Sequence, residues 1–315
     1  QRTRFRSSLL CIRNSEVFTH VLVLTTIGYV LQQSKRGIQL LCTSITNWRI
    51  FMGMTKDFEL PKDLTPFREI LQQTLVPTSH ITLSNTPTTL YNSKFGGDPY
   101  LPKNRHLPKD SQGREMRLLA QINFSELSLP QFPKKGLLQF FIPHTVNFND
   151  EESHEDIWQH HFKIRYYSEL RPYDELASVV HTTNENKHFP LQEEKRLHFK
   201  QTDEIVSIMD YRFHTISDTP LSLLFNDDGI NLYDIYMKHF LGQGHKIGGY
   251  PYFTKQDPRE RYAFLRKYDV LLLQVESDDE NGIMWGDCGV ANFFINSINL
   301  ANGDFSDILY HWDHY

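Results

Sequence analysis

Cysteine is scarce in this chain of 315 residues. Two of its three cysteines, Cys11 and Cys42, fall in the first fifty-three residues, which leaves Cys288 alone in the remainder. A disulfide framework needs paired cysteines, and a cysteine-based zinc site needs several. We therefore exclude both after residue 53, and we expect a protein of a reducing compartment, the cytoplasm.

Most of the chain also lacks a surplus of basic residues. Residues 1–53 carry seven Lys or Arg and one acid, whereas the whole chain has a net charge of -5, so residues 54–315 carry -11. Nucleic acids are bound by basic faces, because the phosphates need neutralising contacts. We predict that nucleic acid is not a partner and that the acidic body suits a basic protein partner.

A long hydrophobic run is missing too. The most apolar stretch, Val17 to Leu31, has fifteen residues and contains a histidine, three threonines and a glycine, whereas a membrane span needs about 20 apolar residues. From Met54 onward the sequence becomes rich in acidic residues and proline. We interpret residues 1–53 as translated upstream sequence or a wrong start codon, with a membrane anchor or signal and genuine added structure as alternatives. For residues 54–315 we predict no membrane association.

A repeated motif is the most informative feature that is present. Lys94–Lys103 reads KFGGDPYLPK and Lys246–Lys255 reads KIGGYPYFTK, an offset of 152 residues. Two later blocks repeat at an offset of 153: RLLAQI at 117–122 with VLLLQV at 270–275, and GLLQFFI at 136–142 with GVANFFI at 289–295. We interpret this as an ancient internal duplication. The halves span about 90–170 and 243–315 within one domain of residues 54–315.

The remaining pattern predicts an α+β fold that is internally duplicated, with mostly antiparallel sheets and a few helices. Short β-branched and aromatic runs with hairpin-length connections favour antiparallel strands over regular alternation of strand and helix. Residues 80–90 read as a strand that Pro87 places at a sheet edge. We expect helices at 64–75 and 229–241, and strands at 117–124, 137–142, 163–167, 270–275 and 290–295.

The two glycine-rich loops are candidate ligand loops. Paired glycines between lysines can cradle a phosphate, but neither copy has a GxxxxGK[ST] or GxGxxG pattern. A tight turn into a strand, with positive φ at the glycines and a proline two residues later, is the structural alternative. The residues that this hypothesis names are Lys94, Gly96, Gly97, Tyr100, Lys246, Gly248, Gly249 and Tyr252.

Cys288 is a candidate nucleophile, because GDCG at 286–289 matches the sequence around the nucleophile of chymotrypsin-like cysteine proteases. Only twenty-seven residues follow it, and it aligns with Lys135 in the first half. A catalytic thiol also needs a partner that depresses its pKa. We therefore predict no catalytic residue.

Clusters of histidine and acidic residues have the composition of metal sites without the spacing. The first cluster lies in the polar stretch 147–161 and the second in the terminal YHWDHY, and neither matches a helical HExxH motif. We predict no metal and no cofactor. The residues concerned are Glu151, Glu152, His154, Glu155, Asp156, His160, His161, His311, Asp313 and His314.

The body from Met54 to Tyr315 resembles the YwqG-like bacterial proteins, a family of unknown function. The resemblance rests on FGGDPYLP, RLLAQINFSEL, GLLQFFI, HKIGGYPYFTKQDPR, LLLQVESDD, IMWGDCGVANFFI and DFSDILYHWD. It covers none of residues 1–53. It implies a cytoplasmic bacterial α+β protein without an established activity, cofactor or catalytic residue to carry over.

The same resemblance implies a protein-interaction role, because genes of this family tend to lie near secreted-toxin loci. We therefore expect an immunity-type module that masks a basic toxin domain, with a broad acidic patch over Glu151, Glu155, Asp278, Asp279 and Glu280 and no pocket. The alternative is a small-ligand-binding protein or an enzyme whose two GG-x-P-Y loops face each other across a cleft. An enzyme should bring Lys94 and Lys246, or Cys288 and a histidine, within hydrogen-bonding reach.

Overall fold

The computed structural model describes residues 10–14, 17–24, 27–34, 37–42, 58–144, 146, 161–177 and 189–315. The chain divides into two compact units, Gln1–Lys62 and Asp63–Tyr315. The first contains a four-stranded antiparallel sheet in chain order, β1 (Leu10–Asn14), β2 (Val17–Leu24), β3 (Ile27–Ser34) and β4 (Gly37–Cys42). The apolar run from Val17 to Leu31 thus contributes to two paired strands. Within the described ranges, no helix has the length and apolar character needed to cross a membrane.

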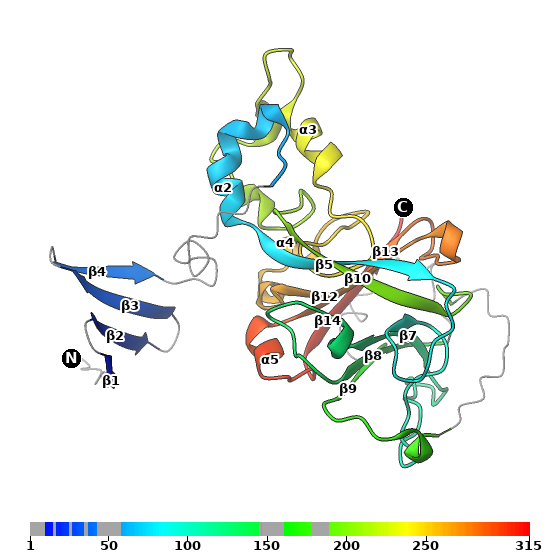
Figure 1. Cartoon of the computed structure of the whole chain (residues 1–315). Helices are drawn as coiled ribbons and strands as arrows, with labels where there is room; N and C mark the ends of the chain where they lie inside the picture. Colours follow the sequence, from blue (N-terminus) through cyan, green and yellow to red (C-terminus); the bar gives the residue numbers. More distant parts are fainter. Residues whose placement is uncertain are drawn as a thin grey trace, which may run out of the picture. The chain divides into compact units, whose positions relative to one another are not determined.

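The second unit is built on a ten-stranded antiparallel sheet that curls into a half-barrel (Figure 1). Its strand order is β14-β13-β12-β11-β5-β10-β6-β7-β8-β9. The strands are β5 (Val76–Ser84), β6 (Lys94–Phe95), β7 (Arg117–Asn123), β8 (Leu137–Ile142), β9 (Lys163–Tyr167), β10 (Lys195–Glu204), β11 (Lys246–Gly248), β12 (Val270–Glu276), β13 (Val290–Ile295) and β14 (Ile308–Asp313).

The helices are short, and this overturns the prediction of an α+β fold. The α-helices in the described part are α2 (Arg68–Gln73), α3 (Leu232–His239), α4 (Pro258–Arg261) and α5 (Ser297–Ala301). The first expected helix starts instead as the 3-10 turn η1 (Lys62–Phe67), and the second begins only after the Asn231 cap. Because no helix of the described residues forms a layer across the sheet, the fold is mostly β.

The two halves share one pattern of strand pairing. Lys94 of β6 lies opposite Gln121 of β7, as Lys246 of β11 lies opposite Gln274 of β12. Both β7–β8 and β12–β13 contain a register shift at the corresponding leucines, and β9 and β14 complete the two edges. The repeated blocks of sequence therefore occupy equivalent places in the sheet.

The halves exchange their first strands at the centre of the sheet. β5 precedes the first motif but pairs with β11 of the second half, and β10 precedes the second motif but pairs with β6 of the first. Since Lys94 pairs with Arg196 and Lys246 pairs with His80, Arg196 and His80 are counterparts. Thr82 and His198 have the same separation in sequence as His80 and Arg196, so they are counterparts as well. They also lie opposite each other in the β5–β10 pair, so a pseudo-twofold axis passes between them.

This central position corrects the edge assignment of the strand near Pro87. β5 runs from Val76 to Ser84 and lies between β11 and β10. The strand therefore ends before Pro87, which takes no part in the ladder and removes none of its hydrogen bonds.

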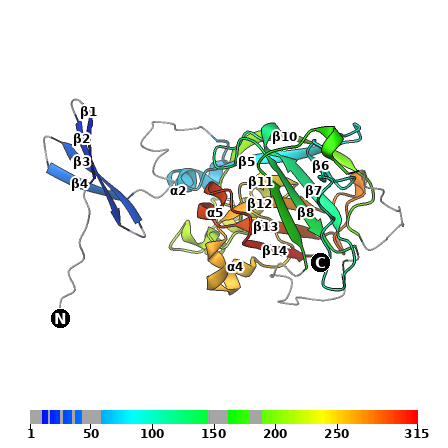
Figure 2. The same ribbon diagram turned by 90° about the horizontal axis from the view of Figure 1, so that it is seen from below.

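The core forms where the two arms of the curled sheet meet. In both views, the arm that carries β8 lies against the arm that carries β13 (Figures 1 and 2). Phe140 packs on Phe293 with ring centroids 4.9 Å apart, and Phe162 packs on Tyr310 at 5.3 Å. β8 and β13 are buried on both faces, because the glycine loops and their aromatic residues cover the outer side. Continuous apolar sequence in both strands follows from this double burial.

Candidate functional site

The glycine loops are tight turns at the start of each half. Gly96, Gly97, Gly248 and Gly249 have φ between +64° and +71°, the left-handed region that the turn interpretation predicts. A side chain at Gly97 would collide with the carboxylate of Glu194, and one at Gly249 would collide with Glu204. Both positions therefore require glycine for two reasons, backbone conformation and space.

The lysine of each motif is buried against a glutamate of β10 or the residue just before it. Lys94 is 1% exposed, and its Nζ lies 3.2 Å from Glu194 Oε2. Lys246 is 0% exposed, and its Nζ lies 3.0 Å from Glu204 Oε2. Each lysine thus has its own acidic partner, and no hydrogen bond in the described part of the chain joins the two lysines.

In both pairs an opposite charge acts against the effect of burial on the pKa of the ionised group. Burial raises the pKa of Glu204, but the charges and hydrogen bonds of Lys246 and His80 outweigh burial and lower the pKa to about 2. His80 contributes a contact of 3.1 Å between its Nε2 and Glu204 Oε1. Burial lowers the pKa of the Lys94 amine, and Glu194 acts in the opposite direction.

Buried amides hold the tyrosine of each motif in matching positions. Gln121 Oε1 accepts a hydrogen bond of 2.8 Å from the Tyr100 backbone N–H, and Gln274 Oε1 accepts one of 2.8 Å from Tyr252. On the other side, the Nε2 of Gln139 donates to the Tyr100 carbonyl at 2.8 Å, and Asn292 does the same for Tyr252. The motif is a scaffold that is anchored by its own half of the sheet.

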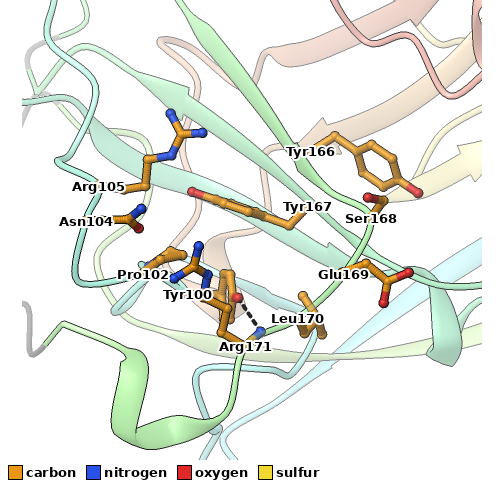
Figure 3. Close-up of a pocket in the computed structure, with 10 residues that line it drawn as sticks. All are labelled: Tyr100, Pro102, Asn104, Arg105, Tyr166, Tyr167, Ser168, Glu169, Leu170 and Arg171. Carbon is orange, nitrogen blue, oxygen red and sulfur yellow. Dashed lines mark hydrogen bonds between the residues drawn. The ribbon is translucent and has the colours of Figure 1, made fainter.

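A pocket of about 340 Å³ lies beside Tyr100, between the first loop and the chain that leaves β9 (Figure 3). The tyrosine of the first motif and the end of β9 therefore both line this pocket. The lining residues are Tyr100, Pro102, Asn104, Arg105, Tyr166, Tyr167, Ser168, Glu169, Leu170 and Arg171.

Aromatic rings form one wall of the Tyr100 pocket. The rings of Tyr100 and Tyr167 meet edge to face, with centroids 5.0 Å apart. Tyr100 is fully buried, and its hydroxyl oxygen accepts a hydrogen bond of 2.7 Å from the backbone N–H of Arg171. This bond ties the segment after β9 to the first loop and shapes the pocket.

One hydroxyl of this wall and one arginine of the same strand are buried donors without acceptors in the described part of the chain. The Tyr167 hydroxyl and Arg165 Nη1 are buried and have no hydrogen-bond partner among the described residues. Figure 3 shows the Tyr167 hydroxyl directed toward Arg105 and Asn104. Burial raises the pKa of Tyr167, against the opposing charges of Arg165 and Arg105 and the close approach of the Arg165 guanidinium, so the hydroxyl keeps its proton near neutral pH. Because a guanidinium can only donate, Arg165 leaves that proton without an acceptor.

The sequence named Tyr100 but missed the other residues of the pocket. Arg105 lies in a polar turn without a motif, and Lys163–Tyr167 was predicted only as a strand. Their proximity depends on the pairing of β8 with β9, in which Leu137 lies opposite Tyr167. The spacing of the motif and of this strand in the sequence contains no signal for that contact.

Cys288 lies in the turn that leads into β13. It is exposed, and its φ of 50° is the one left-handed value of a non-glycine residue in the described ranges. His314 packs against Gly286 in the same turn, with its Nδ1 2.8 Å from the Tyr315 carbonyl oxygen. In the described part of the chain no hydrogen bond joins Cys288 to a histidine.

The predicted acidic and histidine-rich clusters are only partly visible. Glu151, Glu155 and the histidines at 154 and 160 lie outside the described residues. Asp278 is occupied internally, since its carboxylate accepts from Asn281 at 2.7 Å and lies 3.5 Å from His245. Within the described ranges, no group of three His, Cys, Asp or Glu side chains could hold a metal ion.

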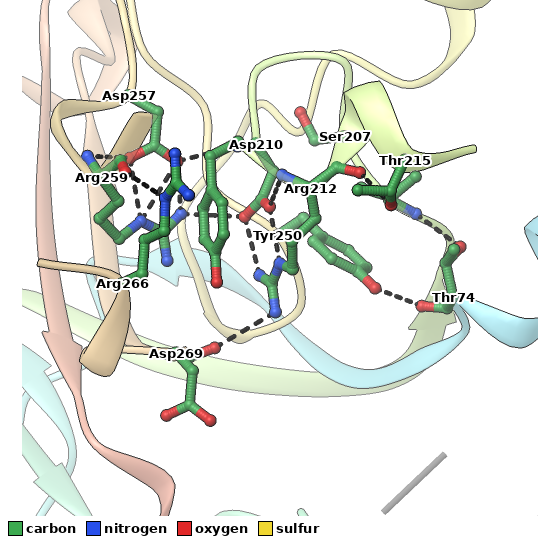
Figure 4. Close-up of polar contacts among 12 residues, drawn as sticks. Thr74, Ser207, Asp210, Arg212, Thr215, Tyr250, Asp257, Arg259, Arg266 and Asp269 are labelled. Carbon is green, nitrogen blue, oxygen red and sulfur yellow. Dashed lines mark hydrogen bonds and ion pairs between the residues drawn. The ribbon is translucent and has the colours of Figure 1, made fainter. Parts of the chain in front are cut away.

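A buried charge network joins the segment after β10 to α4 (Figure 4). Arg259 is fully buried and bonds Asp257 at 2.7 Å and Asp210 at 2.9 Å. Arg212 bonds the other side of Asp210 at 2.7 Å. Burial raises the pKa of Asp210, but Arg259 and Arg212 outweigh burial and lower it. Each of these charges is paired within the described part of the chain, so the cluster is a structural network and not a candidate site.

The repeated motif and its anchors fall within a region that matches a known family. No curated protein matches this chain. A family profile with the description "Domain of unknown function (DUF1963)" matches residues 93–313, which include both glycine loops, both buried amide pairs and the Tyr100 pocket. The chain belongs to the DUF1963 domain family.

Proposed function

We propose that this protein is a small-ligand-binding protein whose site is the Tyr100 pocket. The observation that carries the proposal is a concave site lined by aromatic rings and by a buried polar group, the Tyr167 hydroxyl, that has no acceptor in the described part of the chain. Ligand sites in proteins combine those two features. The first GG-x-P-Y loop contributes Tyr100, while the lysines of both loops stabilise the scaffold. The narrower YwqG-like assignment, a bacterial origin and a cytoplasmic location belong to the same proposal, supported by the motifs and by the single cysteine after residue 53.

A pocket-filling variant tests this function. We expect a thermal-shift screen of small metabolites to find compounds that raise the melting temperature of the wild type. Ser168→Trp, which fills the pocket from an exposed position, should abolish the shift. Ser222→Trp, at an exposed position in another region, should retain it. Compounds that stabilise both tryptophan variants equally, or no stabilising compound at all, would contradict the proposal.

A second candidate is a module that binds a basic protein partner, and one surface favours it. The hairpin at 221–232 exposes Leu223, Phe225 and Ile230 by 67%, 62% and 50%. Its tip carries the exposed acids Asp227 and Asp228. Apolar side chains beside acids suit a basic amphipathic segment, and residues 54–315 carry a charge of -11.

The second candidate is tested with a synthetic helix-forming Lys/Leu peptide and isothermal titration calorimetry. Binding to the wild type should weaken at least about tenfold, or ~1.4 kcal/mol, in Phe225→Ser and in the double variant Asp227→Asn/Asp228→Asn. Phe264→Ser is the control, because Phe264 is equally exposed, at 63%, in another segment. Equal loss in the control, or no binding to the wild type, would exclude this surface.

A further inference from the structure

The second half shows what occupies the place that corresponds to Tyr167. In β8–β9, Gln139 lies opposite Arg165 and Leu137 opposite Tyr167. In β13–β14, Asn292 lies opposite His311 and Val290 opposite Asp313. Because β8 and β13 are counterparts, Arg165 corresponds to His311 and Tyr167 corresponds to Asp313.

In the second half a carboxylate is built into this position. Asp313 is 6% exposed, and its oxygens accept hydrogen bonds of 3.1 Å from the backbone N–H groups of Thr254 and Lys255. A basic side chain accompanies it, since His311 Nε2 lies 3.9 Å from Asp313 Oδ2. The carboxylate thus satisfies donors of the loop and compensates a neighbouring base.

In the first half the basic partner is present and the carboxylate is missing. Arg165 replaces His311, and Tyr167 supplies a donor where Asp313 supplies acceptors. The Tyr167 hydroxyl and Arg165 Nη1 are buried and have no acceptor among the described residues. Arg105 is an exposed residue of the pocket lining, so its guanidinium is hydrated and supplies charge at the pocket rather than a buried unsatisfied donor. Leaving a buried donor unsatisfied costs about 1–3 kcal/mol, so an acceptor that enters the pocket would bind favourably.

The acidic groups near the pocket do not fill this role. Glu169 lies on the pocket wall but forms a 2.6 Å ion pair with Lys135. Glu175 is bound to Arg171 at 3.1 Å. The cation that faces the pocket without a partner in the described part of the chain is Arg105. Positive charge is therefore focused at one end of the pocket on an otherwise acidic body.

Resting on the proposed function, we propose that the ligand carries an anionic oxygen group, a carboxylate or a phosphate, which accepts hydrogen bonds from Arg105 and from the Tyr167 hydroxyl. The anionic group would accept hydrogen bonds in the first half, as the Asp313 carboxylate does at the corresponding position of the second half. Guanidinium groups bind both kinds of anion through paired N–H donors. The adjacent rings of Tyr100 and Tyr167 favour a flat or apolar remainder of the ligand.

Calorimetric titration of the full chain with matched probes tests the charge. Benzoate and benzamide share a ring and differ in the anionic group, and phenyl phosphate distinguishes a phosphate site from a carboxylate site. We expect benzoate or phenyl phosphate to bind at least about tenfold more tightly than benzamide, or ~1.4 kcal/mol. Arg105→Gln should remove this difference. Lys200→Gln, which removes an exposed positive charge on β10, should not.

Tyr167→Phe and the pocket-filling Ser168→Trp together separate the failure of this inference from the failure of the proposed function. Tyr167→Phe keeps the ring and should weaken anion binding without changing benzamide binding. If all probes bind equally, and Ser168→Trp abolishes binding of all of them, the pocket binds ligands but the anionic group is wrong. If no probe binds, but the metabolite screen finds stabilising compounds whose effect Ser168→Trp abolishes, this inference fails and the proposed function stands. If Ser168→Trp leaves ligand binding unchanged, both proposals are overturned.

Discussion

Two carboxylates occupy the space that a side chain at the second glycine of each motif would need. Glu194 packs over Gly97 and Glu204 packs over Gly249, each while paired with the motif lysine. Backbone conformation alone would permit a strained alanine. The contact with the ion pair adds to that strain, because the carboxylate has to move away from its lysine to make room for a Cβ atom.

Gly97→Ala should therefore destabilise the protein more than a glycine-to-alanine change at a position that has the same backbone conformation but no neighbouring atoms. Positive φ costs alanine about 1–2 kcal/mol, and displacement of Glu194 from Lys94 adds to that, for a total of ~3 kcal/mol. Gly229 is the matched control, since its φ is +76° and nothing lies within 4 Å of an added Cβ. Urea unfolding measures both variants. Equal losses of free energy would show that the ion pair plays no part.

The low pKa of Glu204 predicts a loss of stability in acid. A carboxyl group whose pKa is lowered on folding stabilises the protein above its unfolded pKa, and this stabilisation is lost as the pH falls through the folded pKa. The pKa falls from 4.5 to about 2, so up to ~3 kcal/mol should disappear between those pH values. Breaking the pair through Glu204→Gln should cost ~3–5 kcal/mol at pH 7.

Unfolding free energies of the wild type and Glu204→Gln across this pH range measure the effect. The variant should show a flatter dependence on pH. Exposed Glu169, changed to Gln, serves as a control, because its ion pair with Lys135 is 79% exposed on the glutamate side and should contribute little. Parallel pH profiles for the wild type and Glu204→Gln would contradict the assignment.

At the scale of elements, a strand plus a buried amide is the unit that positions each loop. Gln121 accepts from the Tyr100 N–H and donates to the carbonyl groups of Leu90 and Asn92 at 2.9 Å each. Gln274 repeats the arrangement with Tyr252, Gly242 and Gly244. β7 and β12 thus hold the loops through side chains as well as through their ladders.

Gln121→Leu should destabilise the fold and open the pocket, because it leaves one backbone N–H and two carbonyl groups unsatisfied. We expect a loss of ~3 kcal/mol of unfolding free energy and faster amide exchange at Tyr100. Gln201→Leu on the exposed face of β10 is the control, with an expected change within about 0.5 kcal/mol. A tolerated Gln121→Leu would mean that the β6–β7 pairing alone positions the loop.

At the scale of the whole molecule, the exchange of first strands makes the halves interdependent. β5 contributes to the sheet of the second half, and β10 contributes to that of the first. Fragments that end before residue 189 or begin there would each lose a neighbouring strand and leave sheet edges unpaired.

Separate expression of residues 58–188 and 189–315 tests this interdependence. Each fragment alone should lack a cooperative thermal transition, whereas the mixture should recover the circular-dichroism spectrum and the transition of the intact chain. Cooperative unfolding of either fragment alone would show that its half folds without the exchanged strand.

The sequence predicted the elements better than their association. The bounds of β8, β9 and β13 follow from short apolar or aromatic runs that are buried or paired along their whole length. The α+β prediction was wrong, because the helix expected at 64–75 begins as a 3-10 turn that contains Pro66, and the helix expected at 229–241 is only the eight residues of α3. Strand exchange and the meeting of Arg105 with Tyr167 depend on long-range pairing, which local patterns do not encode.

Hydrogen–deuterium exchange with and without saturating benzoate tests most directly whether the two halves differ as ligand sites. The chain contains its own control, since Asp313 already fills the place in the second half that is open in the first. Protection is expected at residues 100–105 and 165–171, with no change at 252–257 and 311–315. Protection of both regions alike, or of the second alone, would contradict a ligand site specific to the first half.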